Sequence, residues 1–122
     1  MPGRFVILHH TTDAGEHWDL MLESGDVLLT WQLPVEPVST RDLRLPARRI
    51  GDHRKAYLEY EGPISRGRGR VRRIDGGGLE WVEQASDRVR FRLSGGRLEG
   101  LFTLRLEGAD LWVLALSQLP EG

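Results

Sequence analysis

Residues 17–33 decide the fold of this chain and read HWDLMLESGDVLLTWQL. Two runs of alternating side chains flank Ser24-Gly25-Asp26, and a glycine between serine and aspartate is typical of a turn. Neighbouring side chains on a strand point to opposite faces, so Trp18 and the leucines at positions 20 and 22 share one face. We expect that apolar face in the core, with His17 and Asp19 on the other face. The stretch therefore predicts a β-hairpin.

Short runs of the same kind continue along the chain, and glycine-rich turns separate them. Besides His17–Glu23 and Val27–Leu33, we predict strands at Arg4–Thr11, Leu43–Ile50, Ala56–Tyr60, Arg68–Ile74, Leu79–Glu83, Val89–Leu93, Leu98–Leu106 and Leu111–Leu116. Asp75-Gly76-Gly77-Gly78 and Ser94-Gly95-Gly96 are predicted turns. No stretch shows the sustained 3.6-residue apolar period of a helix. The sequence predicts an all-β fold, a single compact antiparallel β-barrel with short turns and little helix, as one domain over residues 1–122.

Composition narrows the possible functions. The chain has 122 residues and no cysteine, which excludes disulfides, thiolate metal sites and cysteine nucleophiles. No apolar run approaches the roughly 20 residues needed to span a membrane. Met1–Arg4 lacks the apolar segment of a signal peptide, so we expect a cytoplasmic protein without a membrane partner. The net charge of −1 gives no global attraction to nucleic acid, although only one of the 17 basic residues, Lys55, is not arginine.

A candidate metal site lies at the start of the chain. His17 and Asp19 are two residues apart on one strand face, with Cβ atoms about 6–7 Å apart, and a hairpin would bring His10 alongside. Two imidazoles and one carboxylate leave coordination positions open, as a catalytic metal needs, and they suit Mn²⁺, Zn²⁺ or Fe²⁺. Two alternatives stay open. The face could be a solvated polar surface, and His9 could replace His10, since neighbours on a strand face opposite ways.

A second candidate cluster lies in the segment Asp52-His53-Arg54-Lys55-Ala56-Tyr57. His53 could act as a metal ligand, a general acid or a phosphate-binding cation, because the pKa of histidine lies near neutrality. The hydroxyl of Tyr57 could donate a hydrogen bond to a phosphate oxygen. The alternative interpretation is a basic surface loop.

Arginines alternate in the third cluster, at positions 66, 68, 70 and 72. On a strand, their four guanidinium groups would line one face, which could follow a phosphate backbone. The alternative is a solvated face that acids such as Asp75 and Glu80 balance.

The order of these features resembles the 3′-phosphoesterase domain of bacterial DNA ligase D, the end-healing module of non-homologous end joining. The resemblance covers roughly residues 5–116. The matching motifs are Arg4–His10, His17–Glu23, Val27–Pro34, Asp52-His53 with Tyr57, Tyr60-Glu61-Gly62, and the tail segments Arg97–Leu104 and Leu111–Leu114.

The resemblance implies a compact β-barrel with a divalent metal, usually manganese, bound by His10, His17 and Asp19. It implies that His53 and Tyr57 contact the terminal phosphate and are the catalytic residues. The implied reaction removes a 3′-phosphate or a 3′-ribonucleotide from a DNA primer strand, which makes DNA 3′ ends and DNA-repair proteins the expected partners.

This chain departs from the family pattern at several positions. Met21 stands where the family has an arginine two residues after the aspartate, and methionine has neither its charge nor its forked donors. Arg54, Arg66 and Arg68 are candidates to bind substrate in its place. Our first hypothesis is a metal-dependent phosphoesterase. The alternatives are a catalytically inactive binding module of the same fold, and a β-barrel interaction domain without a metal.

Overall fold

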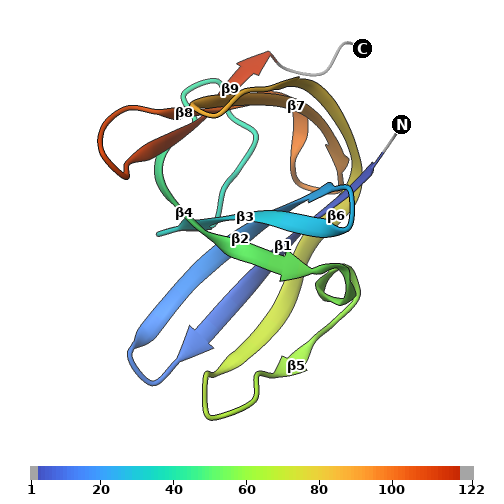
Figure 1. Cartoon of the computed structure of the whole chain (residues 1–122), viewed down its shortest axis with the longest axis vertical. Helices are drawn as coiled ribbons and strands as arrows, with labels where there is room; N and C mark the ends of the chain where they lie inside the picture. Colours follow the sequence, from blue (N-terminus) through green and yellow to red (C-terminus); the bar gives the residue numbers. More distant parts are fainter. Residues whose placement is uncertain (1–2, 119–122) are drawn as a thin grey trace.

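The computed structural model describes residues 3–118, which form nine antiparallel strands and one short 3₁₀ helix (Figure 1). The strands pair in the order β1-β2-β3-β4-β9-β8-β7-β6-β5, and a further pairing of β1 with β6 makes the sheet ring-like. The all-β antiparallel prediction is confirmed. The elements are β1 (Gly3–Thr12), β2 (Gly15–Ser24), β3 (Val27–Leu33), β4 (Arg44–Arg54), η1 (Lys55–Leu58), β5 (Gly62–Pro63), β6 (Arg70–Gln84), β7 (Arg88–Gly95), β8 (Glu99–Leu106) and β9 (Trp112–Gln118).

Two tight turns fix the register of the first three strands. Thr12 pairs with Gly15 across the first turn, and Ser24 pairs with Val27 across the second. Asp19 on the central strand β2 consequently lies opposite Leu8 of β1 and Gln32 of β3. No helix within residues 3–118 has the length and apolar character needed to cross a membrane.

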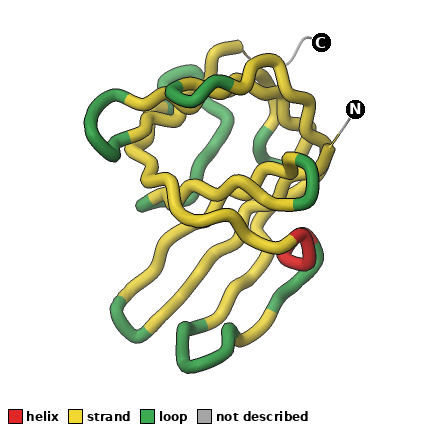
Figure 2. Tube along the Cα trace, in the orientation of Figure 1, coloured by secondary structure: helices red, strands yellow, loops and turns green. Residues whose placement is uncertain are grey.

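The sheet is apolar on both faces at β1 and β2, so the molecule has two apolar clusters. The main core lies inside the ring and includes Trp31, Phe91 and Phe102, all fully buried. A smaller cluster forms on the opposite face of β1 and β2 and is covered by η1. It consists of Val6, Leu8, Met21, Leu28, Leu58 and Val71, with Tyr57 and Ile64 packed against it. Figure 2 shows η1 in red beside the strands that extend below the ring.

The predicted strand over Ala56–Tyr60 is wrong, because Lys55–Leu58 forms the 3₁₀ helix η1. Tyr57 and Leu58 are neighbours in sequence, yet both pack against the smaller apolar cluster. A strand would turn them to opposite faces, whereas a helical turn lets both reach the same cluster.

The predicted turn at residues 75–78 is also wrong, since these residues lie inside the long strand β6. β6 pairs with β1 through Arg70–Leu79 and with β7 from Gly77 onward, so its glycines lie between two neighbouring strands. A Cβ atom at Gly77 would lie 2.2 Å from the carbonyl oxygen of Ser94, which only glycine avoids. The two strands predicted at 68–74 and 79–83 are therefore one.

The predicted row of four arginines on a single strand is wrong as well. β6 begins at Arg70, and Arg66 and Arg68 lie in the preceding turn region. Arg66 has a φ of 63°, a left-handed backbone conformation that a strand does not contain. Arg66 and Arg68 therefore do not share a strand face with Arg70 and Arg72.

Candidate metal and phosphate site

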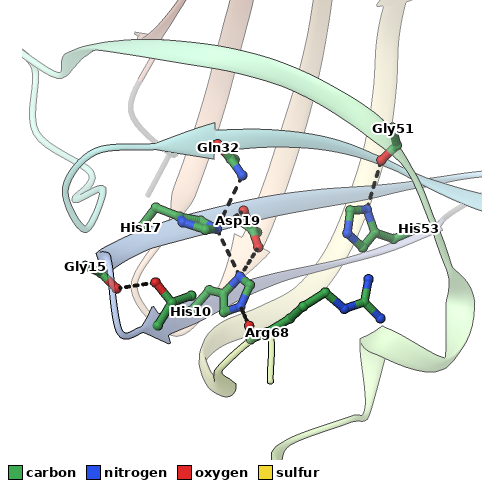
Figure 3. A network of polar contacts seen from close by, with 9 residues as sticks. His10, Gly15, His17, Asp19, Gln32, Gly51, His53 and Arg68 are labelled. Atoms are coloured by element: carbon green, nitrogen blue, oxygen red, sulfur yellow. Dashed lines mark hydrogen bonds and ion pairs between the residues drawn. The ribbon is translucent and has the colours of Figure 1, made fainter. Parts of the chain in front are cut away.

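Two imidazoles and a carboxylate meet near the end of β1 and the start of β2 (Figure 3). His10 and His17 are direct cross-strand partners, and Asp19 lies two residues further along β2 on the same face. His10 Nδ1 is 3.1 Å from His17 Nε2 and 3.7 Å from Asp19 Oδ2. His17 Nε2 is 3.2 Å from Asp19 Oδ1. The three side chains thus converge on one point, as the strand register requires.

A hydrogen bond sets the orientation of the His10 ring. His10 Nε2 lies 2.6 Å from the carbonyl oxygen of Arg68, a contact in which the ring nitrogen must donate. With the proton on Nε2, the neutral ring carries its lone pair on Nδ1, toward His17 and Asp19. This arrangement of an imidazole between a carbonyl and a ligand position is usual at protein metal sites.

Asp19 is a buried carboxylate with too few donors. Its residue is 3% exposed, and Oδ1 accepts no hydrogen bond of good geometry from any described residue. Burial raises the pKa of the Asp19 carboxyl above its ordinary value, and the charges of the neighbouring imidazoles offset part of that rise. Because the pKa stays raised despite these imidazoles, a further positive partner would stabilise the charged form of Asp19.

The three donor atoms fit a divalent cation. An ion with tetrahedral bonds of about 2.0–2.2 Å holds its ligand atoms about 3.2–3.6 Å apart. His10 Nδ1 and His17 Nε2 are 3.1 Å apart, Asp19 Oδ1 is 3.2 Å from His17 and Asp19 Oδ2 is 3.7 Å from His10, and one donor atom from each residue lies within 4.8 Å of the others. A cation bound by His10, His17 and Asp19 would also supply the positive charge that Asp19 lacks. Nitrogen and oxygen donors suit manganese and zinc alike.

His9 does not join this cluster. Its ring stacks on Trp18 with centroids 4.5 Å apart, and its Nε2 lies 2.7 Å from Glu16 Oε1. Trp18 itself packs against the main core on the opposite face of β2. The structure therefore brings His10, and not His9, to His17 and Asp19.

A small cavity of about 100 Å³ adjoins the three ligands. Its lining includes His10 and Asp19 together with His53, Tyr57 and Arg68. His53 comes from the end of β4, and its Nδ1 donates a hydrogen bond of 2.9 Å to the carbonyl oxygen of Gly51. The rings of His53 and Tyr57 meet edge to face at 5.5 Å. Within residues 3–118, neither His53 Nε2 nor the Tyr57 hydroxyl forms a hydrogen bond, so both polar groups are available.

The three arginines predicted to bind substrate lie in different places. Arg68 lines the cavity, and Figure 3 shows its guanidinium group on the His53 side. Its Nε donates to the carbonyl oxygen of Ser65 at 2.9 Å and its Nη2 donates to Ser65 Oγ at 3.1 Å, which leaves the other N–H groups for a ligand. Arg54 lines a separate hollow beside Tyr57 and Tyr60. Arg66 is exposed in the turn.

Met21, at which the family resemblance implies an arginine, lies in an apolar environment. It is 1% exposed and belongs to the smaller apolar cluster, at the floor of the cavity. The apolar cluster and the methionine thus fit one another.

Gln32 is a site residue that the sequence reading missed. Its Nε2 lies 3.4 Å from His17 Nε2, and it faces Asp19 directly across β2 and β3. The hairpin could have identified Gln32. A two-residue turn at Gly25-Asp26 pairs residue 24 with residue 27, and counting outward along both strands pairs residue 19 with residue 32. The carbonyl oxygens of Gly51 and Arg68 were not detectable, since any residue offers one.

Fold and site together define a small antiparallel β-protein whose sheet presents a candidate cation site beside a cavity with histidine, tyrosine and arginine. The family described as the DNA ligase D 3′-phosphoesterase domain matches residues 8–105, which include every residue of that site. The chain belongs to the DNA ligase D 3′-phosphoesterase domain family.

Individual relatives agree with this assignment. One is the multifunctional non-homologous end joining protein LigD of Mycobacterium bovis, which is 29% identical over 116 residues. The multifunctional non-homologous end joining DNA repair protein LigD of Mycobacterium tuberculosis has the same identity over the same length, in two strains. Each alignment covers 89% of this chain but only 15% of the relative, so the chain spans a small part of their length.

Proposed function

We propose that this protein is a divalent-metal-dependent phosphoesterase that acts on DNA 3′ ends bearing a 3′-phosphate or a 3′-ribonucleotide. One observation carries the proposal: the His10–His17–Asp19 cluster adjoins a cavity lined by His53, Tyr57 and Arg68. The family supports the same chemistry, and relatives named for non-homologous end joining make DNA ends and DNA-repair proteins the expected partners.

The three ligands would hold the cation, for which we favour manganese, as the family resemblance implies, with zinc as the alternative. Bound there, it would polarise a phosphoryl oxygen and lower the pKa of a coordinated water. The carbonyl oxygen of Arg68 keeps His10 Nδ1 free of a proton, and Gln32 borders His17. The buried Asp19 supplies the only negative charge among the three.

The remaining groups of the cavity would bind and protonate the substrate phosphate. The bond from His53 Nδ1 to Gly51 holds the ring in place, and within residues 3–118 its Nε2 has no hydrogen-bond partner, so in its doubly protonated form His53 can donate the Nε2 proton to the leaving oxygen. The Tyr57 hydroxyl donates a hydrogen bond to a non-bridging oxygen. The Arg68 guanidinium, held by Ser65, takes over the electrostatic role that the family arginine would have at Met21.

The reaction is tested with purified protein, Mn²⁺ and a primer–template whose primer ends in a 3′-phosphate. We expect release of inorganic phosphate, and we expect His53→Ala to lower the rate about 100-fold or more. His9→Ala is the matched control, because His9 stacks on Trp18 away from the cavity, and it should keep the wild-type rate. A rate that His53→Ala leaves unchanged would contradict the role of His53.

Metal binding is tested separately by titration calorimetry with Mn²⁺. Removing one of three ligands in His17→Ala should weaken the affinity more than about 100-fold, since even loss of an outer partner costs 10–100-fold. His9→Ala again serves as the control. Tight binding of one Mn²⁺ per chain by His17→Ala would rule out the assigned ligands.

A second candidate function is a catalytically inactive module that binds the same DNA ends. The burial of Met21 within an apolar cluster favours it, because the strand then presents no phosphate-binding arginine. The same primer–template separates the two proposals. An inactive module would bind the 3′-phosphate end and release no phosphate, whereas an enzyme loses its phosphate release in His53→Ala.

A further inference from the structure

A groove of about 490 Å³ shares His17 with the candidate metal cluster. It forms where two strands part. β4 pairs with β3 only from Arg48 onward, and its earlier residues Arg44–Ala47 pair with β9 instead. The groove lies between Leu33-Pro34 and Pro46-Ala47, and Leu111 also lines it.

The groove has the size and lining of a site for a flat, mostly apolar group. Its volume falls in the range of about 300–1,000 Å³ that is usual for small-molecule sites. Its apolar lining consists of Leu33, Pro34, Pro46, Ala47 and Leu111, of which the two prolines and Leu111, at 48%, are exposed, while Leu33 and Ala47 are buried. The Asp110 carboxylate at the same groove can accept a hydrogen bond from an amine or a hydroxyl.

Arg48 places a positive charge on the same face as the metal ligands. Asp19 lies opposite Gln32, and Gln32 lies opposite Arg48, so the three side chains form a row across β2, β3 and β4. Two strand spacings separate the Cα atoms of Asp19 and Arg48 by about 10 Å. Arg48 is in none of the ion pairs found within residues 3–118, and a guanidinium group matches phosphate geometry.

We propose that this groove seats the terminal nucleoside of a DNA strand and that Arg48 binds the phosphodiester on its 5′ side. The inference rests on the proposed function, because the 3′-phosphate of the same nucleotide must then reach His10, His17 and Asp19. The sizes of the two hollows support this division. The cavity at His53 measures about 100 Å³ and the groove about 490 Å³, so the cavity suits a phosphate group and the groove suits a base.

Three ligands that cannot be hydrolysed test the proposal by calorimetry with the Mn²⁺-loaded protein. Methylphosphonate probes the small cavity alone, a nucleoside 3′-phosphonate adds the groove, and a dinucleotide with the same 3′ group adds one phosphodiester. We expect the affinity to rise at each step. Arg48→Ala should weaken the dinucleotide about tenfold and leave the nucleoside 3′-phosphonate within about twofold, because only the phosphodiester loses its partner.

Two further variants make the result specific. Leu111→Asp puts a charge into the apolar wall and should weaken both nucleoside ligands about tenfold without changing methylphosphonate. Arg49→Ala is the matched control for Arg48. Its guanidinium lies 5.0 Å from the centre of the Trp31 ring instead of at the groove, and its loss should leave all three affinities unchanged.

The groove assignment is overturned if Arg48→Ala and Arg49→Ala weaken the dinucleotide equally, or if the nucleoside binds no better than methylphosphonate. Failure of methylphosphonate to bind would count against the proposed function at the His53 cavity. In that case a dinucleotide with a 3′-hydroxyl decides on the groove. Binding that Arg48→Ala weakens supports it, and no binding overturns it.

Discussion

Asp19 and Asp75 are both buried carboxylates of the same sheet, with exposures of 3% and 7%, but their surroundings differ. Asp75 accepts backbone N–H groups from Gly96 at 2.8 Å, Arg97 at 3.1 Å and Leu98 at 2.8 Å. Asp19 has the imidazole nitrogens of His10 and His17 at 3.7 and 3.2 Å, and among residues 3–118 its Oδ1 finds no hydrogen-bond donor. The first carboxylate is satisfied by the fold, and the second is not.

The difference separates a structural carboxylate from a candidate functional one. Burying a charge costs free energy that hydrogen bonds or a counter-charge must offset. The chain supplies this compensation to Asp75 with its own backbone and so fixes the turn between β7 and β8. At Asp19 the compensation has to come from a bound cation or from protonation. Exchanging each aspartate for asparagine, which keeps the shape and removes the charge, is therefore a direct test of the comparison.

The largest expected effect is at Asp75. In Asp75→Asn, one oxygen becomes an NH₂ group that faces backbone donors, so we expect the free energy of unfolding to fall by about 2–3 kcal/mol. Urea denaturation followed by tryptophan fluorescence measures it. The folded fraction should keep the Mn²⁺ affinity of the wild type, because Asp75 lies outside the ligand cluster. A loss below about 1 kcal/mol would show that the three backbone contacts matter little.

Asp19→Asn should change the stability in the opposite direction when no metal is present. Because burial raises the pKa of Asp19, the contribution of this residue to the stability of the metal-free fold is greatest below the ordinary carboxyl pKa and is lost as the pH rises through the raised value. Asp19→Asn removes that loss, so at neutral pH we expect its Tm to exceed that of the metal-free wild type by a few degrees.

Added Mn²⁺ then reverses the order of the two proteins. Binding only to the folded state should raise the Tm of the wild type, while Asp19→Asn, having lost its charged ligand, should respond little. Scanning calorimetry with and without Mn²⁺ measures both effects. A metal-free variant less stable than the metal-free wild type would mean that the imidazoles already compensate the carboxylate, and the comparison with Asp75 would fail.

The sequence identified Asp19 as a candidate metal ligand, but it placed Asp75 in a turn instead of a strand. The i, i+2 spacing of His17 and Asp19 and the family order identified the metal candidates, since alternation on a strand is a local property. The run Asp75-Gly76-Gly77-Gly78 has the composition of a turn, but it lies mid-strand because β1 and β7 both approach it closely. That requirement is set by distant strands, and no local pattern reports it.

The approach of Arg68 to the cavity depended on tertiary structure in the same way. Its position follows from the left-handed backbone at Arg66 and from the contacts with Ser65, none of which strand alternation suggests. The row from Asp19 through Gln32 to Arg48 is a mixed case. The hairpin turn determines its first pair, while the second depends on the irregular pairing of β3 with β4, where the register shifts between Leu28 and Thr30.

The smallest effect is expected at Glu23, a half-exposed carboxylate further along the strand that carries Asp19. Lys55 Nζ lies 3.0 Å from Glu23 Oε2, the backbone N–H of Arg4 donates to Oε1 at 2.9 Å, and the hydrogen bond with Lys55 is the main cause of a lowered pKa at Glu23. A lowered pKa stabilises the fold above the ordinary carboxyl value, and the gain is lost as the pH falls through the lowered one. Glu23→Gln should therefore cost less than about 1 kcal/mol at pH 7, and the difference should vanish in acid. Urea denaturation across that pH range measures it. A difference that persists in acid would assign the stabilisation to packing instead of charge, and Glu23 would then resemble neither Asp19 nor Asp75.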